Sequence, residues 1–169
     1  EWFVPESLAA STVLDQSAII AGDFRIDASG HMRFAIFADP ATGPRRVGRI
    51  VQRVCEIETY KAMSMLGLPC AQELSRRMGP LDEGMSKLVD EMTGDLGSPD
   101  ETLSQLLSIA ADLENLMAQT SFRFGATGAY EAIVNQRISV MREERYEGRQ
   151  TFSEFMMRRF DPAMRTVNS

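Results

Sequence analysis

Carboxylates are the residues of this chain whose types and spacing come closest to a chemical site. They occur as three adjacent pairs around a turn-like stretch: Asp82 with Glu83, Asp90 with Glu91, and Asp100 with Glu101. Carboxylate oxygens are the ligands that Mg²⁺ and Ca²⁺ prefer, so this acidic tip could recruit a divalent cation weakly. Neighbouring residues on a helix point in different directions, however, and a solvated acidic face is the simpler interpretation.

The other residues able to do chemistry are few and isolated. His31 is the single histidine and stands beside a predicted turn, so a nucleophilic system would have to be built around an exposed side chain. Cys55 and Cys70 lack the spacing of a zinc site, a redox pair or a disulfide framework. No phosphate-binding glycine loop or zinc helix motif occurs. We therefore expect no catalytic residue, no cofactor, no metal centre and no enzymatic activity.

Composition indicates a folded protein with one strongly acidic region. Of the 169 residues, 44% are hydrophobic, enough for a single domain with its own core. The net charge of −6 argues against a nucleic-acid or anionic-membrane binder, which would carry a basic face. Residues 80–116 hold nine carboxylates and one lysine, a net charge of −8. No apolar run reaches the roughly 18 residues that span a bilayer.

The N-terminal part, residues 1–43, is predicted to contain strands. The stretches "SAIIAGDFRID" (17–27) and "HMRFAIFAD" (31–39) are rich in Ile and Phe, and the residues between them are typical of hairpin turns. We expect two antiparallel strands here, preceded by one or two helical turns in "PESLAAS". An isolated β hairpin is marginal in water, so these strands must pack on a helix or join further strands.

Two long helices are predicted after the strands, over 45–94 and 99–147. In both, apolar residues follow spacings of three and four without a break, as in a heptad seam. The seam residues are Ala71, Leu74, Met78, Leu81, Met85, Leu88 and Met92 in the first helix, and Leu103, Leu106, Ala110, Leu113, Met117, Thr120 and Phe124 in the second. Ser98, with Glu101 three residues later, forms a capping-box pattern that opens the second helix. The short turn before it makes the two helices an antiparallel hairpin.

Proline, glycine and threonine mark where helices should bend, end or begin. Pro69 predicts a kink near residues 67–69, and Pro80 a milder bend. The second long helix should stop near Gly148, a suitable C-terminal cap. Thr151 and Glu154 form a capping-box pattern that opens a shorter C-terminal helix over 151–166. We expect its apolar face to pack on the base of the hairpin; the alternative is docking on a region outside this chain or on a membrane surface. The predicted fold is therefore mainly α within the α+β class, one domain over 1–169.

The seams also predict which charged residues meet at the base of the hairpin. They place Met92 opposite Leu103, and the same register continued toward the strands brings Glu58 opposite Arg137. A buried carboxylate needs a cation or a hydrogen bond. We therefore interpret the charges of "GRIVQRVCEIETYKAM" (48–63) as cross-helix partners rather than a solvated face.

The expected structural ion pair leaves some freedom of register. Glu58, or failing it Glu56, should pair with Arg137. A slip of one helical turn would bring in other partners: Arg123, or Lys61 with Glu131.

Four motifs follow one another from about residue 17 onward: "GDFRID", "GRIVQRVCEIETYKAM", "SFRFGATGAYEAIVNQRI" and "QTFSEFMMRRFDPAMRT". In this order they resemble an uncharacterised bacterial family, number 3422 among the domains of unknown function, described as predicted membrane-anchored proteins. Members have a further N-terminal region and a C-terminal extension with hydrophobic segments. The resemblance implies that this chain is a soluble middle piece of a membrane-anchored protein. Our expectation for its location is the cytoplasmic side of the membrane. It implies no activity and no catalytic residues.

Two classes of function fit these observations. The first is a non-enzymatic structural or protein-interaction module, in which the helical hairpin presents an acidic tip to a basic protein partner or to copies of itself. The alternative is the cytoplasmic part of a CorA-like cation channel or transport component, because a small sheet followed by long acidic helices is similar in outline; this is fold-level analogy. In either case, membrane contact would come through regions outside this chain.

Overall fold

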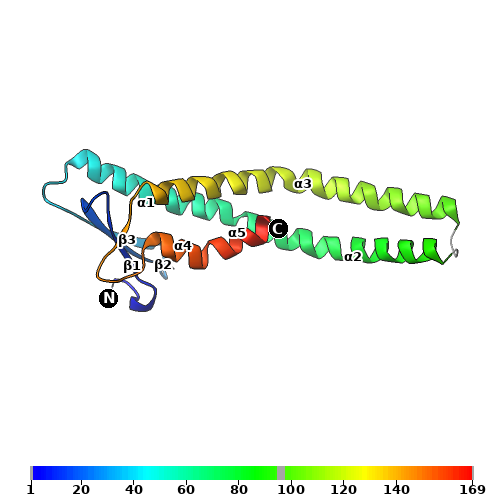
Figure 1. Ribbon diagram of the computed structural model, residues 1–169, viewed down its shortest axis with the longest axis horizontal. Helices are drawn as coiled ribbons and strands as arrows, with labels where there is room; N and C mark the ends of the chain where they lie inside the picture. Colours follow the sequence, from blue (N-terminus) through cyan, green and yellow to red (C-terminus); the bar gives the residue numbers. More distant parts are fainter. Residues whose placement is uncertain (1, 95–97, 169) are drawn as a thin grey trace.

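The computed structural model describes residues 2–94 and 98–168 and has an elongated shape (Figure 1). A small sheet with helices packed on it forms a head, from which two long helices project as an arm. The elements are η1 (Pro5–Ser7), β1 (Ala9–Val13), β2 (Ala18–Ile26), β3 (Met32–Ala38), α1 (Pro44–Met65), α2 (Gly67–Thr93), α3 (Pro99–Ser139), β4 (Glu144–Arg145), α4 (Phe152–Arg159) and α5 (Asp161–Asn168). This arrangement confirms the predicted mainly helical α+β fold.

The sheet is antiparallel, with strand order β3-β2-β1-β4. The predicted β hairpin is confirmed as β2 and β3, in which Ile20 faces Ile36. The predicted helical turns in "PESLAAS" are correct only for η1, because the chain from Ala9 to Val13 pairs with β2 as strand β1. Strand β4 was not predicted either; Glu144 faces Thr12 across the far edge of β1. Strand β4 depends on a partner distant in sequence, which a local pattern does not reveal. Strand β1 instead joins β2 through a four-residue turn, in which Leu14, Asp15 and Gln16 all have positive φ values that their residue types do not indicate.

The second long helix is shorter than predicted. α3 ends at Ser139, not near residue 147, and the chain then turns through Arg142 with a φ of +49° before forming β4. Met141 is buried in the core beneath the sheet, which draws the chain away from the helix axis. Gly148, expected as the helix cap, instead has a φ of +72° in the loop that leads to α4. Glycine adopts this left-handed conformation at little cost.

The first long helix is interrupted where a kink was expected. α1 ends at Met65 and α2 begins at Gly67, so the bend near residues 67–69 is a break between two helices, while Pro80 lies inside α2. A Cβ atom on Gly67 would lie 2.4 Å from the hydroxyl oxygen of Thr127 in α3. The two helices therefore pack so tightly at this point that only a glycine fits.

The predicted seam is only partly correct along the arm, which we define as residues 74–94 of α2 and 98–124 of α3. On α3, Leu106, Leu113 and Thr120 face α2 as expected, but Leu103 and Met117 are exposed by 56% and 69%. The inward positions between them are held by Thr102, Ile109 and Leu116. On α2, Gly84 lies over Ile109, and Met85 and Met92 are exposed. Where two apolar residues are adjacent, as in Leu116 and Met117, either of them could continue the three-four spacing of the seam. The packing of α3 against α2 decides which one is turned inward.

The two predicted capping boxes differ in outcome. Thr151 and Glu154 form a complete capping box at the start of α4. Ser98 is the N-cap residue of α3, but its side chain makes no capping hydrogen bond, so the box expected with Glu101 is wrong. Ser98 is exposed, and water can satisfy the free backbone groups there.

The core lies in the head and forms two connected clusters. One cluster joins the sheet to α1 and α4 through residues such as Ile20, Ile50 and Phe152. The other joins α1, α3, α4 and α5 through Ile57 and Val134, with the C-terminal helices on the outside. Helices α4 and α5 pack within this chain on the base of the arm, as expected for the C-terminal region, and the chain ends beside the start of α2 (Figure 1).

Candidate functional site

Arg137, on the last turn of α3, forms an ion pair with Glu56 of α1. The Arg137 Nε atom donates a hydrogen bond to Glu56 Oε2, and the two side chains are 32% and 23% exposed. Gln52 donates from one turn earlier to the other carboxylate oxygen, at 2.8 Å. The hydrogen bond from Gln52, followed by that from Arg137, lowers the pKa of Glu56. The partner of Arg137 is thus the second of the two carboxylates that the sequence proposed.

The first choice, Glu58, has a different partner. Lys61 Nζ lies 2.6 Å from Glu58 Oε1, within α1, and also 4.8 Å from the ring centre of Phe24. The expected Glu58–Arg137 pairing is therefore wrong, because Glu58 projects toward the sheet side of α1. Arg123 is exposed on the arm and joins no ion pair among the described residues.

Phe24 is the centre of an aromatic cluster that fastens α4 to the sheet. Its ring stacks on Phe155 with ring centres 4.0 Å apart and an angle of 14° between planes, and it meets Phe34 and Phe152 edge to face. Phe24 has a φ of +54° within the irregular stretch of β2 between Gly22 and Ile26. A bulged strand can redirect a side chain in this way. The motif "GDFRID" thus serves packing of the head.

Glu143 is a second buried connection that sequence analysis did not single out. Its carboxylate accepts hydrogen bonds from Ser11 Oγ at 3.0 Å and from the backbone amides of Phe152 at 3.1 Å and Ser153 at 2.8 Å. Burial raises the pKa of Glu143, and these three hydrogen bonds oppose the rise. The carboxylate lies at the N-terminus of α4 and joins that helix to β1. Its hydrogen-bonding capacity is used within the fold.

The residues weighed for chemistry do not converge. Among residues 2–94 and 98–168, no three His, Cys, Asp or Glu side chains are arranged to hold a metal ion. Residues 95–97, part of the acidic tip, lie outside the described residues. His31 is exposed in the β2–β3 turn, where its backbone amide donates to Asp27. The hollow beside Trp2 and Asp23 is open, and Asp23 is already bonded to the backbone of Val4 and Arg25.

The arm has two flanks of contrasting chemistry on either side of its buried seam. The polar flank consists of residues one position before seam residues: Arg77, Pro80, Glu83 and Lys87 of α2, and Glu101, Gln105, Ser108, Asp112, Asn115, Gln119 and Arg123 of α3. The apolar flank consists of residues one position after them: Ser75, Gly79, Asp82, Met85 and Val89 of α2, and Leu103, Leu107, Ala110, Glu114, Met117 and Ser121 of α3. One residue rotates a side chain by about 100° around the helix axis. In an antiparallel pair, residues one position after the seam therefore lie on the same side of the pair in both helices, and residues one position before it lie on the opposite side.

Contacts with other residues support this assignment of the flanks. Arg77 donates a hydrogen bond to Gln119 at 3.2 Å, which joins the polar flank across the two helices. On the other side, a groove of about 910 Å³ is bordered by the start of α2, by Phe124 and by the end of α5. Its α2 residues include Gln72 and Ser75, each one position after a seam residue. Helix α5 therefore covers the beginning of the apolar flank.

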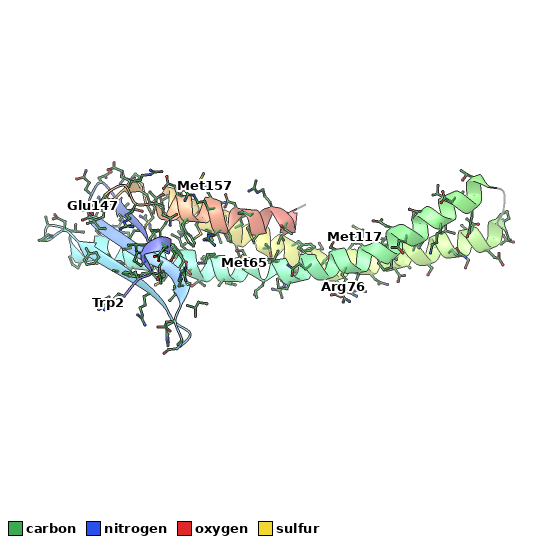
Figure 2. All side chains as sticks on the ribbon, turned by 90° about the horizontal axis from the view of Figure 1, so that it is seen from below. Trp2, Met65, Arg76, Met117, Glu147 and Met157 are labelled. Carbon is green, nitrogen blue, oxygen red and sulfur yellow. The ribbon has the colours of Figure 1, made fainter. Side chains whose placement is uncertain are left out.

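Beyond the end of α5, the apolar flank is uncovered. Leu107 is 62% exposed, Val89 51% and Met117 69%, and at the tip Met92 is 61% exposed. Figure 2 shows Met117 and Arg76 on the arm, past the point where α5 stops. The sequence signal for this flank was present as adjacent apolar residues, such as Leu106 with Leu107 and Leu116 with Met117, which are more than one seam requires.

The molecule is thus an α+β head that carries a two-helix arm with one exposed apolar flank. The chain belongs to the family described as "Protein of unknown function (DUF3422)", whose model matches residues 1–169. Neither the curated proteins nor the solved structures include a match to this chain. In the part of the chain that the structure describes, no helix combines the length and the apolar character needed to cross a membrane.

Proposed function

We propose that this chain is a non-enzymatic protein-interaction module of a membrane-anchored bacterial protein, and that the arm is the part that receives the partner. The observation that carries the proposal is the exposed apolar flank. A two-helix hairpin can bury one seam, and this arm has enough large apolar residues for a second contact. Contiguous apolar patches of several hundred Å² are uncommon on monomeric proteins and mark interaction sites.

The division between head and arm also supports an interaction role. Nearly all fully buried large side chains lie in the head, where the ion pair of Glu56 with Arg137 and the Phe24 cluster fasten the base. On the arm, Leu88 and Leu116 are the buried members of the seam. Because the core lies in the head, the arm can present its apolar flank to a partner without rearrangement of that core.

Photo-crosslinking in the native host tests this proposal. Benzoylphenylalanine is introduced at Leu107 on the apolar flank and, as the matched control, at Gln105 on the polar flank of the same helical turn. We expect irradiation to join the protein covalently to another protein from position 107 and not from position 105. Equal yields from both positions, or no adduct from either, would contradict an interaction role for this flank. A ladder of adducts made only of this chain would favour the symmetric assembly of a CorA-like component.

A further inference from the structure

We infer that the apolar flank seats a basic amphipathic helix, that is, an α-helix with a line of apolar side chains bordered by Lys and Arg. This inference rests on the proposed interaction function and gives the chemistry of the partner. Three observations carry it: the charges of the flank, the helix that already covers its beginning, and the area that remains open.

The charges of the apolar flank are of one sign. Its two ionisable residues on the arm are Asp82 and Glu114, and the seam register places them on neighbouring turns of α2 and α3. Of the arm's cations, Arg77, Lys87 and Arg123 belong to the polar flank, on the other side of the seam. Arg76 points away from the seam and pairs with Glu73 of its own helix. A helix that lies on the apolar flank would therefore meet carboxylates and no cation. Lysine or arginine beside its apolar line would be attracted, and glutamate or aspartate would be repelled.

The chain's own last helix shows that this part of α2 accepts an apolar helical face. α5 packs on the first turns of α2, and its Met164 and Val167 side chains are buried. The charged residues of α5 are Asp161 in its first turn and the exposed Arg165 in its last turn. The preference for a basic partner therefore rests on the carboxylates of the flank, Asp82 and Glu114. The groove at the end of α5 leads onto the open stretch, so a partner helix would continue along the same track.

The open stretch is large enough for a weak, reversible complex. Past the residues that border the groove at α5, residues 79–93 of α2 extend about 22 Å at 1.5 Å per residue, and two adjacent helices present a face about 20 Å wide. A helix seated along it would bury roughly 450 Å² on each partner, or about 900 Å² in total, the size of weak and transient interfaces. A second copy of the arm fits less well, because residues 80–116 carry a net charge of −8 and two such arms would repel.

Fluorescence anisotropy with a labelled model peptide tests the inference on the intact chain. The probe is an 18-residue Leu/Lys peptide designed as an amphipathic helix, titrated at about 0.15 M salt. We expect saturable one-to-one binding that Leu107→Glu weakens by roughly tenfold or more, as for a residue at an interface centre. Leu107→Glu adds a negative charge, so simple attraction of the cationic peptide would instead become stronger. The matched variant Gln105→Glu adds the same charge on the polar flank and should leave the affinity unchanged.

Further measurements would show that the apolar flank binds something other than a basic amphipathic helix. A scrambled peptide of the same composition that binds equally well would mean charge attraction only, and a Leu/Glu peptide that binds as tightly would refute the basic chemistry. Sedimentation of the chain alone that shows a dimer, converted to monomer by Leu107→Glu, would make a second copy the occupant. Met117→Glu, at an exposed position, repeats the test in case Leu107→Glu impairs folding. Crosslinks from position 107 in the host without peptide binding would retain the interaction function and reject this partner chemistry.

Discussion

Two carboxylates of α1 lie near the base of the arm, and the direction in which each leaves the helix decides which one Arg137 binds. Glu56 and Glu58 are separated by about 200° around the axis. Ile57, between them, is buried in the core. Glu56 therefore emerges toward α3, whereas Glu58 emerges toward Phe24 and pairs with Lys61. The register predicted from the sequence correctly placed Arg137 beside this part of α1. The side of the helix on which each carboxylate lies then decides that Glu56, and not Glu58, is its partner.

The ion pair of Glu56 with Arg137 should be measurable as a modest coupling. We expect a double-mutant cycle of Glu56→Gln and Arg137→Met to give about 0.5–1 kcal/mol, because both side chains remain partly exposed and water screens the pair. The quantity to measure is the free energy of unfolding in urea. The same cycle with Glu58→Gln in place of Glu56→Gln is the control and should give a coupling near zero. A larger coupling for Glu58 would mean that the assignment is reversed.

At the scale of elements, Gly67 and Thr127 make a tight contact between α2 and α3. A Cβ atom at residue 67 would lie 2.4 Å from Thr127 Oγ1 and 2.9 Å from its Cγ2 atom. The Thr127 hydroxyl is buried and makes no hydrogen bond with the described residues. The start of α2 is therefore held against α3 by shape, at the point where the break between α1 and α2 sets the direction of the arm.

We expect Gly67→Ala to lower the free energy of unfolding by about 1–3 kcal/mol, since the added methyl group overfills a tight contact. Gly128→Ala is the matched control on α3, because a Cβ there meets nothing within 4 Å. It should raise stability by up to about 1 kcal/mol through helix propensity. Thr127→Ala removes both crowded atoms, so the double variant with Gly67→Ala should recover much of the loss. Without such recovery, the contact would not be the cause. Urea titration followed by circular dichroism measures all four proteins.

At the scale of the whole molecule, the ionised side chains of the head determine how stability depends on pH. The hydrogen bond from Arg145, followed by that from the Thr151 amide, lowers the pKa of Glu154, and Gln52 and Arg137 lower that of Glu56. Stabilisation from a lowered carboxylate pKa is complete above the ordinary value of 4.5 and is lost as the pH falls through the folded-state pKa. Glu143 acts in the opposite direction, because burial raises its pKa and protonation relieves the cost of the buried charge.

The variant Arg145→Met isolates one of these contributions. At pH 7 it should reduce the free energy of unfolding by about 0.5–1 kcal/mol, because Arg145 is 58% exposed and solvent weakens its pairing with Glu154. This difference from the native chain should shrink as the pH falls below 4.5, where Glu154 becomes protonated. Urea titrations at several pH values between 7 and 3 measure it. Arg149→Met, at an exposed arginine of the same loop, is the control. A difference that stays constant with pH would exclude the charge of Glu154 as its cause.

The features that could be predicted from the sequence alone are those that depend on residues close together in the chain. The β2–β3 hairpin, the break before Pro69 and the capping box of Thr151 with Glu154 all depend on short-range geometry, and the structure contains each of them. The heptad spacing also predicted the antiparallel helical pair, because residues three and four apart share a helix face wherever the helix packs.

The tertiary structure alone decided the features that depend on partners distant in the chain. Strand β4 exists because β1 supplies its hydrogen bonds, and α3 stops at Ser139 because Met141 enters the core of the head. The choice between two overlapping seams on the arm was likewise not local. Leu106 and Leu107 are equally apolar, and only the fit against α2 turns one inward and leaves the other 62% exposed. The apolar flank, and with it the surface for a partner, is the result of that packing choice.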